Sequence, residues 1–379
     1  MKPTRRDDKH VAVYLPSLRG GGAERVMVTL ANGFAARGFA VDLVLAKAEG
    51  PYLNDVAPRV RVVDLGARGV LASLPALMGY LRRQRPCAML SALSHANVIA
   101  LLARRLAGGR TRLVVSEHSH LSLSMKDEPS RRGRLMPWFM RRTYPWADGV
   151  VAVSTGVADD LARAIALPRE SIEVIYNPVV GEQTLCLANA PLDHPWFAPG
   201  EPPVVLGVGR LTAAKDFSVL LRAFASVRKM RPARLMILGE GELRPELEAL
   251  VRQMGIGADV ALPGFQANPL VYMRRAALFV LSSRFEGLGN VLIEAMACGT
   301  PVVSTDCPSG PAEILEGGKW GRLAPVGDAE ALAEAMLATL AETQHPDVAH
   351  RARDFGVDRA VDGYLRVLLG DRGAQAEKP

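Results

Sequence analysis

Short β-rich runs alternate with amphipathic helical stretches along almost the whole chain, and this alternation limits the possible folds most strongly. Between several of the runs lie helical patterns, for example over Ala23–Arg37 and Asn97–Leu106. Strands joined by crossover helices form a parallel sheet with helices on both faces, so the pattern predicts an α/β fold. The strands predicted in the first half are Val11–Leu15, Val41–Leu45, Val60–Val63, Ala88–Ser91, Leu113–Ser116, Gly149–Val153 and Ile172–Ile175.

The alternation breaks near the middle of the chain and then resumes. Residues 181–203 contain five prolines and two glycines without a clear period, which is typical of a linker. A chain of 379 residues is long enough for two domains. We therefore predict one domain over residues 1–180 and a second over residues 204–357. The strands predicted in the second are Val204–Val208, Leu235–Leu238, Val260–Leu262, Ala277–Leu281 and Pro301–Ser304.

The composition is that of a globular protein, and it excludes several other classes. Charged residues interrupt every apolar run before it reaches the length of a membrane span. The N-terminal segment Met1–Lys9 lacks the apolar core of a signal peptide. Four cysteines without close metal-type spacing favour a reduced, cytoplasmic protein. These are Cys87, Cys186, Cys298 and Cys307.

The net charge of +7 is unevenly distributed. Residues 1–185 hold 26 Lys and Arg against 16 Asp and Glu, whereas residues 186–379 hold 20 against 23. The first half is therefore expected to meet an anionic surface or acceptor. Nucleic acid would be one such partner, but no helix-turn-helix, RNA-binding or finger signature occurs. The basic and aromatic stretch Arg131–Trp146 suits a bilayer interface with anionic head groups, or equally a helix whose aromatic residues pack in the core.

Two glutamates in the second half stand eight residues apart, Glu286 in a glycine-rich loop and Glu294 in the predicted helix that follows. The glycines allow a ligand to approach the backbone, and a helix N-terminus attracts an anion. Carboxylates beside an anion site accept hydrogen bonds from hydroxyls. The pattern therefore indicates a nucleotide sugar, which carries both phosphates and hydroxyls. The alternative is a helix cap followed by a surface glutamate.

Three further loops follow predicted strands, where ligands of open α/β sheets bind. Arg210 and Lys215 can converge on one diphosphate or can be two solvated surface cations. The glycines Gly20–Gly22 suit close approach of a phosphate, or a plain tight turn. The loop Ser116–His120 contains two histidines, His118 and His120. A histidine at this position can face a ligand, or it can make a hydrogen bond that is only structural. The two histidines could also bind a metal ion together, but no third metal ligand is evident.

Taken together, these motifs resemble those of retaining glycosyltransferases of family 4, which have the GT-B fold of two Rossmann-like domains. The resemblance runs from about Val11 to Leu369, and its strongest parts are Gly20–Arg25, Gly207–Asp216 and Phe285–Pro301. It implies two parallel sheets that face a central cleft, and a final helix, about 358–369, that packs back on the first domain. The run Ser304–Leu315 is similar to that of members that build surface polysaccharides and lipid-linked glycans.

The resemblance also implies roles for particular residues. His118, or alternatively Glu117, would contact the donor sugar, and Arg210 and Lys215 would neutralise the departing diphosphate. Glu286 would bind sugar hydroxyls and Glu294 the ribose. The remaining donor-binding residues would be Gly21, Gly22, Gly239, Gly264, Phe265, Gly287, Leu288, Gly289 and Asn290.

The expected reaction transfers a sugar from a nucleoside-diphosphate sugar to a lipid-linked or glycan acceptor. We expect the donor to be a UDP-sugar. Asp-x-Asp, which holds a divalent cation in many transferases, does not occur. Because Arg210, Lys215 and a helix start can supply the positive potential, we expect no metal and no other cofactor. The alternatives are a nucleotide-sugar epimerase on the same fold and a non-catalytic binding protein, and no pyridoxal-lysine motif favours a phosphorylase. The protein is expected in the cytoplasm, in peripheral contact with the membrane through the basic first domain.

Overall fold

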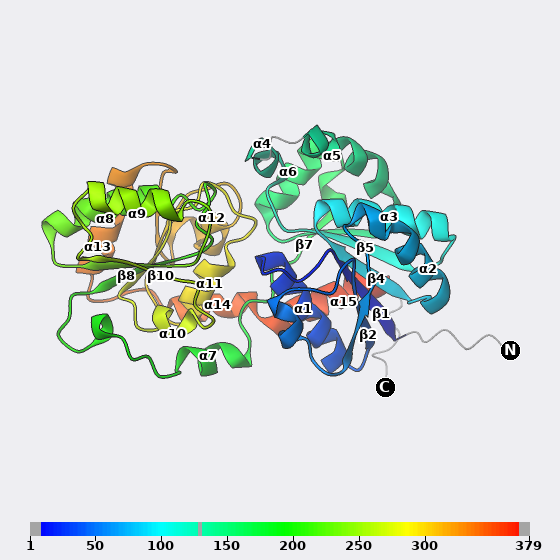
Figure 1. Cartoon of the computed structure of the whole chain (residues 1–379), viewed down its shortest axis with the longest axis horizontal. Helices are drawn as coiled ribbons and strands as arrows, with labels where there is room; N and C mark the ends of the chain where they lie inside the picture. Colours follow the sequence, from blue (N-terminus) through cyan, green and yellow to red (C-terminus); the bar gives the residue numbers. More distant parts are fainter. Residues whose placement is uncertain (1–8, 128–130, 371–379) are drawn as a thin grey trace. The chain divides into compact units, whose positions relative to one another are not determined.

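The computed structural model of the chain describes residues 9–127 and 131–370 (Figure 1). It divides into two compact units, each with its own sheet. Unit 1 comprises Met1–Pro178 and Val357–Pro379, and unit 2 comprises Val179–Gly356. Every strand pair is parallel, as the alternating pattern predicts for an α/β fold.

The sheet of unit 1 has seven strands in the order β3-β2-β1-β4-β5-β6-β7. The order reverses between β1 and β4, so the loops that follow these two strands leave the sheet in opposite directions. Every strand predicted in the first half is present, and no strand end shifts by more than one residue. The strands are β1 (His10–Leu15), β2 (Ala40–Leu45), β3 (Val60–Asp64), β4 (Ala88–Ala92), β5 (Arg112–Glu117), β6 (Gly149–Ala152) and β7 (Ile172–Val174).

Helices cover both faces of this sheet (Figure 1). One face carries α1 and the C-terminal helix α15, which contact each other over a largely aliphatic core that also holds Phe34 and Tyr364. The other face carries α2, α3, α5 and α6. The helices of unit 1 are α1 (Gly22–Ala36), α2 (Leu74–Gln84), α3 (Ser94–Ala107), α4 (Leu121–Asp127), α5 (Arg131–Thr143), α6 (Thr155–Ile165) and α15 (Val357–Leu369).

The sheet of unit 2 has six strands in the order β10-β9-β8-β11-β12-β13, with its reversal between β8 and β11. The strands are β8 (Val204–Val208), β9 (Arg234–Leu238), β10 (Val260–Gly264), β11 (Leu278–Leu281), β12 (Val302–Thr305) and β13 (Arg322–Ala324). The sequence does not predict β13, because its three residues contain no apolar run. The helices are α7 (Glu182–Ala188), α8 (Phe217–Met230), α9 (Arg244–Gln253), α10 (Leu270–Met273), α11 (Asn290–Ala297), α12 (Pro311–Ile314), α13 (Ala329–Ala341) and α14 (Val348–Ala352).

The segment 181–203, predicted as a linker, contains α7 and belongs to unit 2. Helix α7 packs against α10, and Asn268 Nδ2 donates to the carbonyl of Leu187 over 2.8 Å. Arg275 similarly donates to the carbonyl of Ala190 over 2.9 Å. These contacts tie the proline-rich segment to the body of unit 2.

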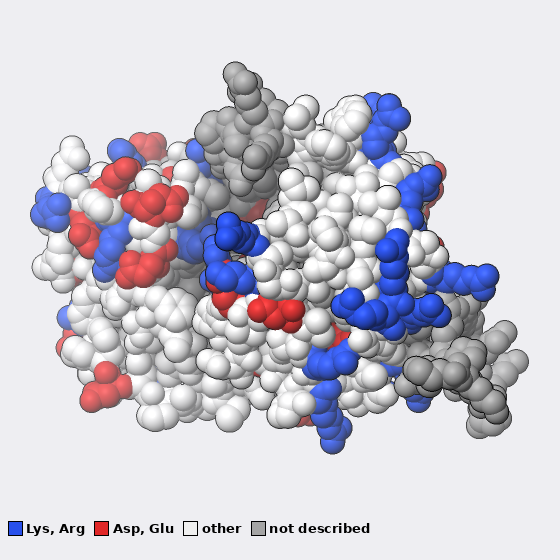
Figure 2. Space-filling model, turned by 45° about the vertical axis from the view of Figure 1, so that its right-hand side comes forward, with Lys and Arg blue, Asp and Glu red and all other residues white. Residues whose placement is uncertain are grey.

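The uneven charge seen in the sequence is visible on the surface. On the face shown in Figure 2, Lys and Arg predominate over the part formed by unit 1, whereas both signs mix over unit 2. Among the described residues no helix is both long enough and apolar enough to cross a bilayer.

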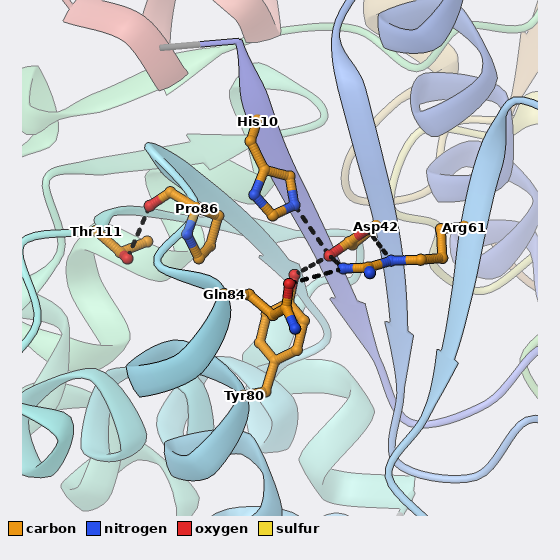
Figure 3. Close-up of polar contacts among 7 residues, drawn as sticks. All are labelled: His10, Asp42, Arg61, Tyr80, Gln84, Pro86 and Thr111. Atoms are coloured by element: carbon orange, nitrogen blue, oxygen red, sulfur yellow. Dashed lines mark hydrogen bonds and ion pairs between the residues drawn. The ribbon is translucent and has the colours of Figure 1, made fainter. Parts of the chain in front are cut away.

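An ionic cluster around the buried Asp42 closes the amino-terminal edge of the unit 1 sheet (Figure 3). The Asp42 carboxylate accepts hydrogen bonds from His10 Nε2 at 2.9 Å, from Arg61 Nε at 2.7 Å and from the Tyr80 hydroxyl at 2.6 Å. Burial alone would raise the pKa of Asp42, but these bonds together hold it below its usual range. The cluster joins β1, β2, β3 and α2, so it is structural and lies at the edge opposite to the predicted ligand loops.

Candidate active site

In unit 2 the loops after β8 and β11 meet at the point where the strand order reverses. The backbone N–H of Arg284 donates to the carbonyl of Ala214 over 2.8 Å, and Ser282 Oγ donates to the carbonyl of Lys215 over 2.9 Å. Parallel α/β sheets bind their ligands at such a switch point, beyond the carboxyl ends of the strands. Two segments far apart in the sequence therefore form one site.

Lys215 and Glu286 are paired across this junction. The Nζ atom of Lys215 lies 2.5 Å from Oε1 of Glu286, and the two side chains are 22% and 11% exposed. An amine and a carboxylate that are both largely withdrawn from water interact more strongly than a surface pair. The structure thus brings together two of the predicted site residues.

Ser283 also binds Glu286 and was not predicted from the sequence. Its hydroxyl donates to Oε1 of Glu286 over 2.6 Å, the same oxygen that Lys215 contacts. Ser283 is fully buried, and Thr305 Oγ1 donates to its carbonyl over 2.6 Å. Both donors thus fix the carboxylate from the Oε1 side. The available signal was the position of Ser283 at the carboxyl end of β11, three residues before the glutamate.

Glycines allow the loops after β8, β9 and β10 to interlock. Gly239 has φ = 141°, and a Cβ atom there would lie 1.9 Å from the carbonyl oxygen of Gly209. The N–H of Gly239 donates to the carbonyl of Gly264 over 2.9 Å, which joins the loop after β9 to the end of β10. Only glycine fits such contacts without a shift of the backbone. The predicted residues Gly239 and Gly264 therefore shape the loop cluster, and Phe265 beside them is 74% exposed.

Helix α11 begins at Asn290, directly after the loop that carries Glu286. Its N-cap is Gly289 with φ = 99°, a left-handed conformation that favours glycine, and Leu288 is 2% exposed and anchors the loop. The first N–H groups of a helix have no partner within it, so this start offers donors to an anion. Glu294, one turn into the helix, is 7% exposed. Gly287 completes this part of the predicted donor loop.

Arg210 is exposed at the end of β8, on the same loop as Lys215. The N–H of the next residue, Leu211, donates to the carbonyl of Glu240 over 2.9 Å, which fastens the loop to its neighbour. The backbone of Arg210 is thereby held while its guanidinium faces solvent. A side chain in this state can reach an anion that approaches the loop.

In unit 1, the predicted residues Gly21 and Gly22 lie at the start of α1, after β1. Gly21 is the N-cap of α1, and a Cβ atom there would lie 2.1 Å from an Oε atom of Glu24. The Glu24 carboxylate thus lies against the backbone at this helix start, and a role of Gly21 and Gly22 in donor binding stays a prediction.

His118 directly follows β5, and its side chain is held by contacts within unit 1. Its Nε2 atom lies 3.0 Å from Ser116 Oγ, which in turn lies 2.8 Å from the hydroxyl of Tyr364 in α15. Nδ1 is buried without a hydrogen-bond partner in unit 1 or elsewhere in the described chain. Burial lowers the pKa of His118 to about 4, so the imidazole is neutral near pH 7. A neutral ring with one unused nitrogen suits contact with a hydroxyl.

Glu117, the alternative to His118, points into the interior. Its carboxylate accepts hydrogen bonds from Ser94 Oγ at 2.9 Å and Asn97 Nδ2 at 3.0 Å, and a further one from the Tyr144 hydroxyl. Burial raises the pKa of Glu117, although these bonds partly oppose the shift. Its acceptor atoms are thus used within unit 1, whereas Nδ1 of His118 has no hydrogen-bond partner there.

The two histidines of this loop do not share a ligand position. His120 Nδ1 lies 3.1 Å from Asp160 Oδ2, whereas His118 contacts Ser116. Within residues 9–127 and 131–370, no group of three or more His, Cys, Asp or Glu side chains is placed to hold a metal ion.

Comparison with known proteins assigns the family. The profile described as Glycosyltransferase Family 4 matches residues 20–182, and that described as Glycosyl transferases group 1 matches residues 202–342. A Campylobacter jejuni protein named N-acetylgalactosamine-N,N'-diacetylbacillosaminyl-diphospho-undecaprenol 4-alpha-N-acetylgalactosaminyltransferase is 30% identical, over 95% of this chain and 99% of its own. The chain is a family 4 glycosyltransferase.

Other relatives agree with this glycosyltransferase assignment. The lipopolysaccharide core biosynthesis glycosyltransferase LpsE of Rhizobium meliloti is 28% identical, over 92% of this chain and 96% of its own. HepE of Anabaena, solved with UDP and glucose, has a TM-score of 0.71 at 22% identity and covers 97% of this chain and 99% of its own. WaaG, a glycosyltransferase involved in lipopolysaccharide biosynthesis, has a TM-score of 0.73 at 16% identity, over 95% and 100%. These structures confirm the GT-B fold.

Proposed function

We propose that this glycosyltransferase transfers a sugar, with retention of configuration and without a metal, from a UDP-sugar to a lipid-linked or glycan acceptor in cell-surface glycan synthesis. The observation that carries the proposal is the Lys215–Glu286 pair at the switch point of unit 2. The names of the relatives support the acceptor class, because the Campylobacter protein is named for a diphospho-undecaprenol substrate and LpsE for the lipopolysaccharide core. The donor class is supported by the UDP and glucose bound to HepE.

In the proposed reaction, charge develops on the diphosphate as the bond from the anomeric carbon to the phosphate oxygen breaks. Arg210 and Lys215 stabilise that charge, together with the N–H groups at the start of α11. These groups supply the positive potential that a divalent cation supplies in other transferases. The acceptor oxygen forms the new bond on the same face of the sugar, and its proton passes to a phosphate oxygen of the departing diphosphate.

The carboxylates and the histidine position the donor. Glu286 accepts hydrogen bonds from sugar hydroxyls through Oε2, because Oε1 is already used by Lys215 and Ser283. Glu294 binds the ribose hydroxyls, and His118 of unit 1 contacts the donor sugar. This arrangement needs no protein nucleophile.

A coupled assay tests the proposal. The purified chain is incubated with UDP-sugars and a polyprenyl-diphosphate-linked acceptor, and release of UDP and the mass of the lipid product are followed. We expect UDP release that depends on the acceptor, survives a chelator, and yields a product with the anomeric configuration of the donor. Donor turnover without acceptor would instead indicate an epimerase. Loss of activity in chelator with recovery in magnesium would refute metal independence, and an inverted product would refute retention.

A further inference from the structure

A long stretch of unit 1 contains arginines but no acidic residue. Between Asp64 and Glu117 the sequence has eight arginines and neither Asp nor Glu, and this stretch includes α2 and α3. The stretch 129–147, which includes α5, has five arginines and again no acid. Helix surfaces that only keep a protein soluble carry both signs, so acid-free helices point to an anionic partner.

These three helices place their arginines at one edge of unit 1. Each carries a pair in its last turn, Arg82 and Arg83 in α2, Arg104 and Arg105 in α3, and Arg141 and Arg142 in α5. Side-chain contacts join the helix ends.

Arg82 Nη2 donates to the carbonyl of Leu106 over 2.8 Å, which ties the end of α2 to α3. The guanidinium of Arg105 lies 4.6 Å from the ring of Trp146, just after α5. We call the exposed members of these pairs, together with the exposed Arg85 directly after α2, the arginine edge; its residues are Arg82, Arg83, Arg85, Arg105, Arg141 and Arg142.

The negative end of the helix dipole attracts basic side chains, and this attraction alone could explain one arginine at the end of each helix. It does not explain the apolar side chains beside them. On α5, Leu135 is 55%, Trp138 55% and Phe139 41% exposed, at the spacing of one helix face, whereas Met140 on the opposite face is buried. We call these three the α5 outer face.

The α5 outer face adjoins the arginine edge directly. The guanidinium of Arg142 lies 5.5 Å from the ring of Trp138, and the rings of Trp138 and Phe139 pack edge to face at 5.0 Å. At the end of α3, Leu106 is 53% exposed between arginines. Aromatic and aliphatic groups bordered by arginines match the boundary between acyl chains and head groups of a bilayer. A nucleic acid would attract the arginines but offers no apolar phase for Leu135 or Leu106.

We propose that the arginine edge and the α5 outer face together dock this protein on an anionic lipid bilayer. The arginines are attracted to the negatively charged head groups, and Leu135, Trp138 and Phe139 enter the interfacial region. This partner is additional to the donor and acceptor, and the surface uses none of the residues assigned to the reaction.

Vesicle flotation with the full chain tests this proposal. We compare vesicles of phosphatidylcholine alone with vesicles that contain phosphatidylglycerol, at low and high salt. We expect the wild-type chain to float with the anionic vesicles at low salt and to be released by salt. Since each basic residue near such a surface contributes roughly fivefold to the affinity, the variant Arg83→Gln/Arg105→Gln should bind about 25-fold more weakly. The variant Trp138→Ala/Phe139→Ala should lose binding to a similar extent.

A matched variant separates a local effect from a general one. Lys229 and Met230 are exposed on α8 in unit 2, so Lys229→Gln/Met230→Ala removes one charge and one apolar group elsewhere and should leave flotation unchanged. Thermal shift with UDP serves as a separate readout, which should respond equally in all variants, because none touches the donor loops. Equal flotation of the wild type with neutral and anionic vesicles, or of the arginine variant and the wild type, would overturn the proposal. The proposal would also be overturned if the wild-type chain bound duplex DNA, the arginine variant lost this binding, and the aromatic variant still floated with anionic vesicles as the wild type does.

Discussion

Lys215 Nζ and Glu286 Oε1 lie 2.5 Å apart, although the two residues are 71 positions apart in the sequence. They come from the loops after β8 and β11. These two strands are neighbours in the sheet, and the strand order reverses between them. Without a donor, each neutralises the other. A bound diphosphate offers Lys215 a second anionic partner, so the amine is held where the leaving group is expected to acquire charge.

Replacing Lys215 by Met should therefore slow turnover more than it weakens donor binding. We expect kcat to fall by about 10²–10³, the usual cost of one lost donor to a developing charge, while the Kd for UDP rises only a few-fold. Steady-state kinetics and calorimetry measure the two quantities. Lys229→Met, at an exposed position of α8, is the control and should behave as wild type. A Lys215 variant with normal kcat would remove this residue from the reaction.

Ser283 is predicted to act by positioning Glu286. Without its hydroxyl, Oε1 keeps only the lysine contact, and the carboxylate gains freedom to rotate. Since a hydrogen bond to a charged group contributes about 1.5–3 kcal/mol, Ser283→Ala should lower kcat/KM for the sugar nucleotide by roughly tenfold or more. Binding of UDP alone should hardly change, because UDP has no donor sugar for Glu286 to contact. Equal losses for UDP and UDP-sugar would mean that the loop as a whole has collapsed, and Ser226→Ala on the exposed side of α8 controls for the substitution itself.

Glu294→Ala should show the opposite pattern. If Glu294 accepts hydrogen bonds from the ribose hydroxyls, its removal weakens UDP and UDP-sugar alike, by about 10- to 100-fold, with less effect on kcat. Calorimetry with UDP, and with the 2′-deoxy analogue, measures this. The analogue should bind the wild type more weakly and should make little difference to the variant. A variant that still prefers UDP over the analogue by the wild-type ratio would refute the ribose contact.

The sequence predicted the parts of this protein that depend on periodicity and on strand-to-loop position. Each predicted strand exists, and Lys215 and Glu286 meet because both follow strands that lie side by side. What it missed depends on tertiary contacts. Ser283 and Thr305 come from neighbouring strand ends, and only the sheet order shows that they support the same glutamate. Similarly, the support of His118 by Tyr364 joins residues nearly 250 positions apart, for which no local pattern exists.

His118 should make stability depend on pH. Its pKa is about 4 in the folded protein and about 6.5 when exposed, so the unfolded chain takes up the proton first as the pH falls. The neutral ring therefore contributes stability above about pH 6.5 that is lost as the pH approaches 4. Thermal unfolding of the wild type and of His118→Gln between pH 7.5 and 4.5 measures this. The wild-type Tm should fall more steeply, and parallel curves would contradict the buried, neutral state of the imidazole.

Gly239→Ala should test whether the donor loops interlock as described. The new methyl group would lie 1.9 Å from the carbonyl oxygen of Gly209, at a φ of 141° that other residues rarely adopt. Gly255 has a positive φ of 67° but open space around it, so Gly255→Ala isolates the conformational cost, about 1 kcal/mol. We expect Gly239→Ala to cost at least about 3 kcal/mol and to abolish UDP binding, because the loop that carries Arg210 and Lys215 must shift. Similar Tm values for the two variants would mean that the loops after β8 and β9 are not in contact at Gly209 and Gly239. The position of Lys215 would then not depend on that contact.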